Sequence, residues 1–527
     1  MAHSGYAGTE LIRPSNLVVW CRARLWWEVQ LLRSALKNNA LDAVAVLLLG
    51  ALLTWFVWLN VLVTLNVGLS FADDGFFALV SRNLAEGKVY GAPISSAEIQ
   101  PFSAMVSTGP AAILPMAVLI RLFGHSDWLP GLATFLMFLA QITGFGLVLS
   151  RKFGWRPVVV YLAAFLLLLV ILAARATWLF SFFLGECPAL GWLLLGTSLL
   201  LLESRWALVG AGSCFALAGL TKQLPLLAIP GIVSIWTAVT WARLGAMRAA
   251  PGFALLASTI GLPLVLWETV RLIALGWPGY LDVIRETQLQ ATAPAALSVR
   301  ISGFIGALSV YLSPIAAAGC LALAAIGFLI QRRNAAVASL ATFLWGGAAC
   351  YLVFVLLVPP LWVRYFWVGI MLCCAAVCAP LLVLQPRARL TVLIGMMAVV
   401  FAAGWHEPIL AWQKRVLDYR GSEARAAVVR FLDATDMPIA AQTWSSLYDI
   451  LALRQVEGEW VQERDIARFR NRDFLAVIND QLTAKTGEDG RFYRAVSSGC
   501  SSIMQEGRLS VYQCGKEFWP YYEARSL

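Results

Sequence analysis

Leu69-Ser70-Phe71-Ala72-Asp73-Asp74-Gly75-Phe76-Phe77 places two adjacent carboxylates where a long apolar segment ends. Inside lipid each ionised side chain would cost about 2.5–3.5 kcal/mol, and two neighbouring like charges oppose each other's ionisation. One interpretation is that the pair caps a helix through residues 76–84, because Asp is a favoured N-cap residue. The other is that Asp73 and Asp74 act on a substrate just outside the membrane.

The rest of the chain is too apolar for an ordinary soluble protein. It has 527 residues, of which 60% are hydrophobic and only 13% are charged, whereas soluble domains average about 25% charged residues. Apolar runs near the roughly 20 residues that cross a bilayer recur from residue 41 to about residue 410. The polar, basic residues 1–39 show no cleavage site typical of a signal peptide. We predict a mainly α-helical polytopic membrane protein.

The net charge of +10 is located in the membrane part of the chain. Residues 413–527 contain sixteen Lys and Arg and sixteen Asp and Glu, which leaves 24 basic and 14 acidic residues before them. Basic residues between membrane spans mark cytoplasmic loops. The charge therefore predicts an orientation in the membrane and requires no nucleic-acid partner.

Placing the basic clusters inside gives about eleven transmembrane helices, with the N-terminus in the cytoplasm. Residues 17–37 then form an interfacial helix on the membrane lipids, because Trp and basic residues favour that position. The segment from Pro110 to Phe123 is interfacial or re-entrant. The spans are expected at about 42–67, 128–150, 157–174, 182–202, two within 207–241, 253–274, 301–330, 335–358, one ending before Arg387 and Arg389, and 390–405.

Three regions follow from this division: a cytoplasmic interfacial N-terminus (1–40), a transmembrane domain (41–412) whose first outer loop is 69–127, and an extracytoplasmic domain (413–527). In the last region the pattern predicts a small α/β domain, with a helix over 422–434 and strands over 438–442 and 508–514. Cys500 and Cys514 are its only cysteines. We expect a disulfide between them, because a bacterial periplasm oxidises such a pair.

Some cations lie where the positive-inside rule does not put them. Lys222 and Arg364 lie in or against apolar helices, where a cation is costly and usually has a partner. Arg175 and Glu186 lie at neighbouring span ends and are candidates for an ion pair. For Lys222 the alternative is a snorkelling side chain that reaches the interface.

Taken together, these features resemble the GT-C class of polyprenyl-phosphate-sugar-dependent glycosyltransferases, in particular the protein O-mannosyltransferase and lipid A aminoarabinose transferase branches. Two departures are the Thr108-Gly109 pair, where those branches often have His or Lys beside the proline, and Phe76-Phe77, where an Arg-Tyr often follows the acidic pair. The matching motifs are Asp73-Asp74 followed by Arg82, Ser107-Thr108-Gly109-Pro110, Gly185-Glu186, Leu220-Thr221-Lys222 and Arg364-Tyr365.

The resemblance implies transfer of a sugar from a polyprenyl-phosphate donor to a hydroxyl of a glycan, lipid or protein, at the outer face of a bacterial inner membrane and with inversion. A carboxylate must accept the acceptor's proton, and positive charge must stabilise the phosphate leaving group. The implied roles are Asp73 as general base, Asp74 as its partner, Lys222, Arg364, Arg82 and Arg175 as phosphate ligands, and Glu186, Tyr365 and Thr108 as substrate contacts.

No cofactor is required for this chemistry, although a divalent metal at Asp73 and Asp74 is possible. A zinc site has little support, because the chain has three scattered histidines and no Cys-x-x-Cys motif. The competing functions are a lipid-linked-sugar transporter or flippase, for which charges within the membrane are also expected, and a non-catalytic membrane scaffold.

Overall fold

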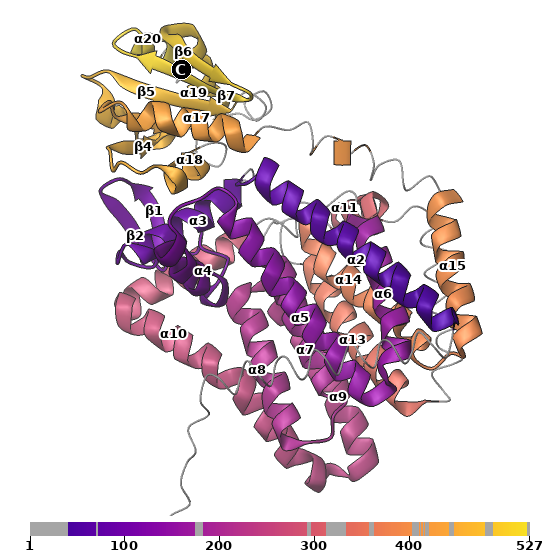
Figure 1. The fold of residues 1–527 in the computed structure, drawn as a ribbon. Helices are drawn as coiled ribbons and strands as arrows, with labels where there is room; N and C mark the ends of the chain where they lie inside the picture. Colours follow the sequence, from indigo (N-terminus) through magenta and orange to yellow (C-terminus); the bar gives the residue numbers. More distant parts are fainter. Residues whose placement is uncertain are drawn as a thin grey trace, which may run out of the picture.

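The computed structural model describes residues 40–69, 72–173, 183–291, 297–311, 334–357, 363–402, 411, 413–414, 416, 421–441, 447–479 and 489–523. A helical bundle carries a small sheet domain at one end (Figure 1). The expected interfacial helix at 17–37 lies outside the described residues, as does Arg175.

The bundle consists of long apolar helices, and six segments among the described residues are long and apolar enough to cross a membrane. The chain is therefore a multi-pass membrane protein, while the total of eleven spans stays a prediction. The helices are α2 (Ala40–Asn66), α5 (Leu129–Phe153), α6 (Trp155–Ala173), α7 (Glu186–Leu199), α8 (Arg205–Thr221), α9 (Ala228–Leu244), α10 (Ala246–Ala291), α11 (Leu297–Tyr311), α13 (Ala335–Leu357), α14 (Val363–Cys378) and α15 (Pro386–Ala402), with 3-10 turns η2 (Leu224–Leu227) and η3 (Ala379–Leu382).

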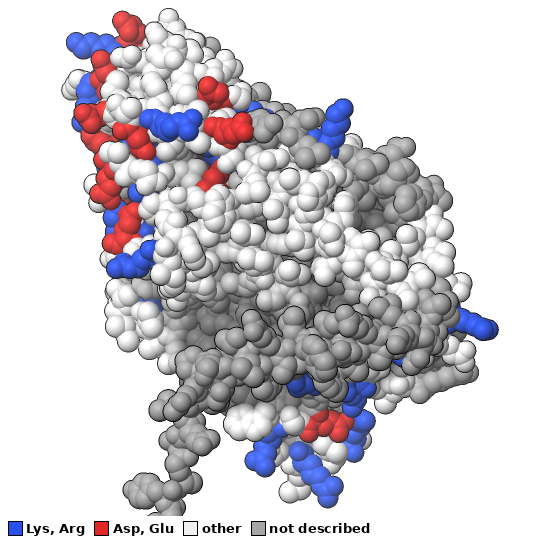
Figure 2. All heavy atoms as spheres, viewed as in Figure 1, with Lys and Arg blue, Asp and Glu red and all other residues white. Residues whose placement is uncertain are grey.

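Charged side chains gather at the two ends of the bundle, and the visible described surface between them is mostly without charge (Figure 2). This distribution fits a hydrocarbon belt around the helices. One helix departs from the expected spans, because α10 continues past residue 274 to Ala291. It is kinked at Gly276, whose φ of 66° and ψ of 170° are not helical. The segment after Gly276, which lies beyond the expected span at 253–274, is therefore helical as far as Ala291.

The first outer loop is folded. It contains α3 (Ala72–Ala85), the hairpin of β1 (Gly91–Ser95) and β2 (Glu98–Pro101), and the expected apolar helix α4 (Pro110–Phe123). Pro110 lies in the first turn of α4, where its missing N–H has no intrahelical partner to lose.

The C-terminal region forms one sheet together with this loop. Its elements are α17 (Gly421–Asp433), β3 (Ile439–Ala441), α18 (Leu447–Leu453), β4 (Trp460–Gln462), η4 (Glu463–Phe469), β5 (Phe474–Asn479), α19 (Asp489–Gly499), β6 (Cys500–Glu506), β7 (Leu509–Cys514) and α20 (Phe518–Glu523). The strand order β2-β1-β4-β3-β5-β7-β6 extends the sheet into the loop, through the pairing of Ser95 with Val461. The small α/β domain thus incorporates a hairpin from the first outer loop.

A set of buried ion pairs and hydrogen bonds, here called the docking network, joins the C-terminal domain to the end of α2 and the first outer loop. Arg425 of α17 lies 2.8 Å from the Asp127 carboxylate and also donates to the carbonyl of Val67. The same carboxylate accepts a 2.7 Å hydrogen bond from the Leu69 N–H. The other members of the network are Arg82, Asp433 and Arg454.

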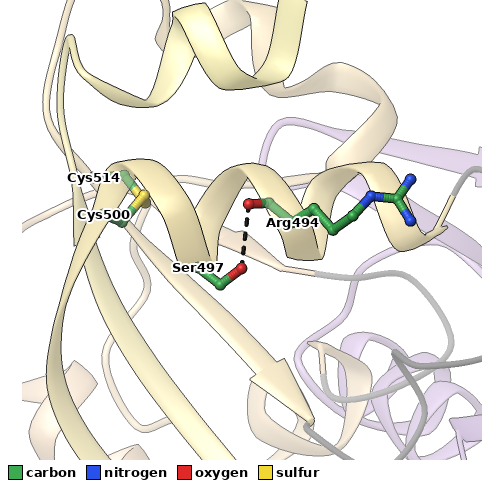
Figure 3. The surroundings of a disulfide bond; sticks show 4 residues. All are labelled: Arg494, Ser497, Cys500 and Cys514. Atoms are coloured by element: carbon green, nitrogen blue, oxygen red, sulfur yellow. Dashed lines mark hydrogen bonds between the residues drawn. A yellow bond between two sulfur atoms is a disulfide. The ribbon is translucent and has the colours of Figure 1, made fainter. Parts of the chain in front are cut away.

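Cys500 and Cys514 form a disulfide across the hairpin of β6 and β7 (Figure 3). The two residues face each other in the ladder, with Cα atoms 4.6 Å apart. Beside the bond, in α19, the Ser497 hydroxyl donates a 3.2 Å hydrogen bond to the carbonyl of Arg494. The disulfide closes the edge of the sheet that lies farthest from the first outer loop.

Candidate active site

The acidic pair lies in the first turn of α3, where negative charge is favoured by the helix dipole. Helix capping does not account for its contacts. The Asp73 carboxylate forms an ion pair with the guanidinium of Arg364, at the start of α14. Asp74 is buried, and its carboxylate accepts a 2.9 Å hydrogen bond from the Gly75 N–H. The two neighbouring acids therefore differ in exposure: the Asp73 side chain, paired with Arg364, is 18% exposed, whereas Asp74 is 1% exposed.

Lys222 lies at the end of α8 and is buried. Its ammonium group is 3.7 Å from the Glu186 carboxylate, which begins α7. It also donates hydrogen bonds to the hydroxyls of Ser107, at 3.1 Å, and Thr108, at 3.4 Å. The side chain is directed into the protein, so the snorkelling alternative is wrong. Glu186 is the partner of Lys222 in the structure, whereas the pairing expected with Arg175 lies outside the described residues.

Backbone contacts hold the first outer loop against the ends of α7 and α8. The Gly109 N–H donates a 2.8 Å hydrogen bond to the Thr221 carbonyl, and the Thr108 hydroxyl donates to the Leu184 carbonyl at 2.9 Å. A Cβ on Gly109 would lie 2.1 Å from the carbonyl oxygen of Leu220. This close approach leaves room only for a glycine at position 109, directly before Pro110.

The four charged groups Asp73, Glu186, Lys222 and Arg364 form one buried group, here called the charge cluster. Arg364 interacts electrostatically with both carboxylates, and Lys222 interacts with Glu186, Asp73 and Arg364. The exposed fractions of the four side chains are between 4% and 18%. Two cations are thus held close together in a medium of low dielectric, where each would interact strongly with an anionic substrate.

Tyr365 and Arg82 have different relations to this cluster. The Tyr365 ring lies under the Arg364 guanidinium, 5.3 Å from its carbon, and the Tyr351 hydroxyl donates to the Tyr365 carbonyl at 2.7 Å. Arg82 does not join the cluster. Its guanidinium binds Glu86 at 2.6 Å and the carbonyls of two residues around the end of α18, Leu451 and Arg454. Arg82 therefore belongs to the docking network.

Two groups near the cluster were not identified from the sequence. Asp449 of α18 lies so close to Gly75 that a Cβ there would be 2.8 Å from the Asp449 carboxylate. Asp449 belongs to the C-terminal domain, and its buried carboxyl lies against Gly75, the residue next to Asp74. Burial raises the pKa of this carboxyl to about 7. No local signal in the sequence relates positions 75 and 449, since only the tertiary fold brings them together.

The second group is aromatic. The Tyr90, Phe102 and Trp267 rings pack together with centroids 5.2–5.7 Å apart, and the Tyr90 hydroxyl donates a 3.2 Å hydrogen bond to the Thr108 carbonyl. Phe102 has a φ of 50°, an uncommon conformation for a bulky residue. Aromatic faces therefore lie beside the loop that contacts Lys222.

A small apolar cavity of about 160 Å³ lies between α4, α5 and the start of α7. It is lined by residues of α4 and α5 together with Phe183, Gly185 and Pro188, which surround the start of α7. Gly185 precedes Glu186, so the cavity begins beside the charge cluster. A polar head in the cluster and an apolar chain in the cavity would suit an amphiphilic ligand.

A divalent metal at the acidic pair would compete with Arg364 for the Asp73 carboxylate. The Asp73 carboxylate is paired with Arg364, and no group of three or more His, Cys, Asp and Glu side chains among the described residues could hold a metal ion. Hard divalent cations in proteins usually need several oxygen ligands.

The sequence matches no protein-family model and no curated protein, but the fold matches solved structures. ArnT from Cupriavidus metallidurans bound to undecaprenyl phosphate aligns over 88% of this chain and 97% of its own, with a TM-score of 0.56 and 15% identity. The apo state of the same protein aligns over 91% and 99%, with a TM-score of 0.58 and 15% identity. The expected resemblance is confirmed at the level of the fold: this chain has the architecture of ArnT, the lipid A aminoarabinose transferase of the GT-C class.

Proposed function

We propose that this protein is a membrane glycosyltransferase that transfers a sugar from a polyprenyl-phosphate donor to an acceptor hydroxyl. The observation that carries the proposal is the charge cluster, in which two buried cations lie beside two carboxylates at the ends of membrane helices. The fold shared with ArnT, one structure of which contains undecaprenyl phosphate, supports a lipid-phosphate donor.

In the proposed reaction Lys222 and Arg364 bind the donor phosphate and stabilise the charge that develops on it as the sugar leaves. Thr108 and Ser107 orient Lys222, and Glu186 holds its charge in place. The small apolar cavity beside Gly185 receives the first part of the polyprenyl chain. These roles use contacts that are present in the structure.

Asp73 is the proposed general base. In the structure Arg364 neutralises its carboxylate, so binding of a phosphate by Arg364 would leave Asp73 to accept the proton of the acceptor hydroxyl. The acceptor oxygen forms a bond to the anomeric carbon while the bond from that carbon to the phosphate oxygen breaks. This single displacement inverts the anomeric centre, and the products are the glycosylated acceptor and the polyprenyl phosphate.

The proposed orientation places the charge cluster and the C-terminal domain on the outer face of a bacterial inner membrane, with the N-terminus and the basic clusters at Arg151, Arg332 and Arg387 inside. Eleven spans satisfy this arrangement. Cysteine labelling from each side of the membrane tests it. A cysteine at position 333 that reacts with an impermeant reagent from outside would overturn the orientation and the assignment of the active face.

The function is tested with membranes incubated with a panel of synthetic polyprenyl-phosphate sugars, with released polyprenyl phosphate measured by mass spectrometry. Loss of a positioned base typically lowers the rate 10²- to 10⁴-fold, and we expect this for Asp73→Asn. Asp282→Asn, at an exposed residue, is the matched control. Normal release by Asp73→Asn with loss in Glu186→Gln would show that the base is wrongly assigned. If no donor released polyprenyl phosphate and the purified protein bound none, the proposed glycosyltransferase activity would be refuted.

A further inference from the structure

A second cavity, of about 470 Å³, lies between the ends of α8, α9, α10 and α13 that are opposite to the C-terminal domain (Figure 1). The turn that joins α7 to α8, residues 200–204, forms part of its lining. The other ends of these two helices carry Glu186 and Lys222. Because the 17 residues of α8 rise about 1.5 Å each, the cavity is about 25 Å from the charge cluster and is a separate site.

Cationic side chains surround this cavity. Among the described residues that line it, Lys152, Arg205, Arg243 and Arg248 face a single carboxylate, Glu203, which leaves a net charge of +3. Glu203 is 3.4 Å from Arg243, and both side chains are exposed. Figure 2 shows Lys and Arg side chains projecting at this end of the bundle. The cavity therefore presents more positive charge than its one carboxylate can neutralise.

Helix-dipole stabilisation does not account for these cations. Arg205 and Arg248 lie in the first turns of α8 and α10, where a positive charge opposes the dipole. Lys152 and Arg243 lie in the last turns of α5 and α9, where it is favoured. Helices both begin and end here, so their dipoles largely cancel. The positive field comes from the side chains.

The inner walls of the cavity are apolar. Leu208 of α8, Trp236 and Val239 of α9, and Phe343 of α13 line it beneath the cationic rim. Trp206, Trp241 and Met247 lie nearby with exposed fractions of 85%, 58% and 92%, as expected for residues at a membrane interface. A small soluble anion would use the rim and leave these walls without a partner.

We propose that this cavity binds the headgroup of an anionic glycerophospholipid, with the phosphate between the cationic side chains and the upper acyl chains against the apolar walls. Basic pockets between membrane helices are suited to such headgroups. The lipid would close the α7–α8 hairpin at the end opposite to the charge cluster and so stabilise the pair of helices that positions Glu186 and Lys222. This inference does not depend on the proposed transfer reaction.

The test is native mass spectrometry of the full-length protein released from micelles with equal amounts of phosphatidylglycerol and phosphatidylcholine. Each cation near a lipid surface contributes about 1 kcal/mol, so Arg205→Gln with Arg248→Gln should weaken phosphatidylglycerol binding roughly 30-fold. The control is Arg151→Gln with Arg387→Gln, which removes equal charge at residues that do not line this cavity. Equal loss in both double variants would overturn the proposal, since a general surface field would then explain the binding.

A third variant tests the cavity without changing its charge. A Cβ on Gly252 would meet Leu208 and Trp236 at 3.5 Å, an ordinary contact distance, and Gly252 lines the cavity, so we expect the longer side chain of Gly252→Leu to extend into this space. Reduced phosphatidylglycerol binding, with unchanged thermal unfolding in lipid-free detergent, would support a lipid in the cavity. Unchanged binding would overturn it. Displacement of the lipid by 10 mM inorganic phosphate would also overturn it, because the site would then belong to a soluble anion.

Discussion

The charge cluster and the docking network are both made of buried carboxylates and cations, but their contacts differ. In the docking network Arg425 meets both oxygens of Asp127 and a backbone carbonyl. In the charge cluster Lys222 is 3.7 Å from its carboxylate and donates to two hydroxyls. A guanidinium that binds both oxygens of a carboxylate stabilises structure, whereas a cation held by weak partners can exchange them for a ligand. The difference distinguishes Arg425, which holds the fold, from Lys222, the proposed phosphate ligand.

The largest effect on stability should follow from breaking the docking network. Arg425→Ala leaves the carboxylate of Asp127 buried without its cation, which typically costs about 3–5 kcal/mol. We expect a lower unfolding temperature in detergent and faster proteolysis of the C-terminal domain. Arg430→Ala, at an exposed position on the same helix, is the control. Adding Asp127→Ala to Arg425→Ala should recover part of the loss, and a double variant no more stable than the single one would contradict the assignment.

The second prediction concerns Lys222, and it separates donor binding from stability. Charged hydrogen bonds contribute about 1.5–3 kcal/mol, so Lys222→Met should weaken binding of undecaprenyl phosphate roughly 10- to 150-fold, measured by titration of the purified protein. Part of any loss of stability would come from the unpaired Glu186. The double variant Lys222→Met with Glu186→Gln should restore the unfolding temperature and leave binding weak. If it restored binding as well, Lys222 would be a structural residue like Arg425.

The smallest predicted effect is a pH dependence at Asp449, which lies close to Gly75 and interacts with Arg425 and Asp127 of the docking network. Burial raises its pKa to about 7, Arg425 acts in the opposite direction, and Asp127 raises the pKa further. In the folded protein this carboxyl therefore binds a proton at pH values where it has lost it in the unfolded chain. Its contribution to stability is full below about pH 4, falls as the pH rises, and is lost above about pH 7.

Asp449→Asn should flatten this part of the profile, and the measurement is the unfolding temperature of both proteins between pH 4 and pH 8. The difference between them should grow toward high pH, where the wild type buries a charge and the variant does not. Parallel profiles would show that Asp449 is solvated, and that its contact with Gly75 is looser than the structure indicates.

The apolar helices could be predicted because each of them is a continuous run in the sequence, and so could the helix that begins at Pro110. Contacts between distant residues could not. The sequence makes Arg175 a candidate partner of Glu186 because both lie at neighbouring span ends, whereas the partner that the structure shows among the described residues, Lys222, follows one helical hairpin later. A single sequence contains no signal for such a choice.

The assignment of Arg82 to the phosphate could have been questioned from the sequence. It follows Asp73 by nine residues in one helix, and at about 100° per residue the two side chains lie on opposite faces. One face of α3 meets Arg364 and the other meets α18. Asp449 and the Tyr90, Phe102 and Trp267 rings had no comparable signal, since they come to the site from separate elements.

The sheet that joins the first outer loop to the C-terminal domain has a consequence for the order of biosynthesis. Ser95 pairs with Val461, so the partner strand of β1 is synthesised several hundred residues after the hairpin of β1 and β2. At about 5–20 residues per second, that interval is on the order of 20–70 s. During it the loop that carries Asp73 and Thr108 cannot complete its sheet. In the proposed orientation the sheet is completed only after β4 has also crossed the membrane, so a protein truncated before β4 should insert its helices but lack the contacts between the first outer loop and the C-terminal domain.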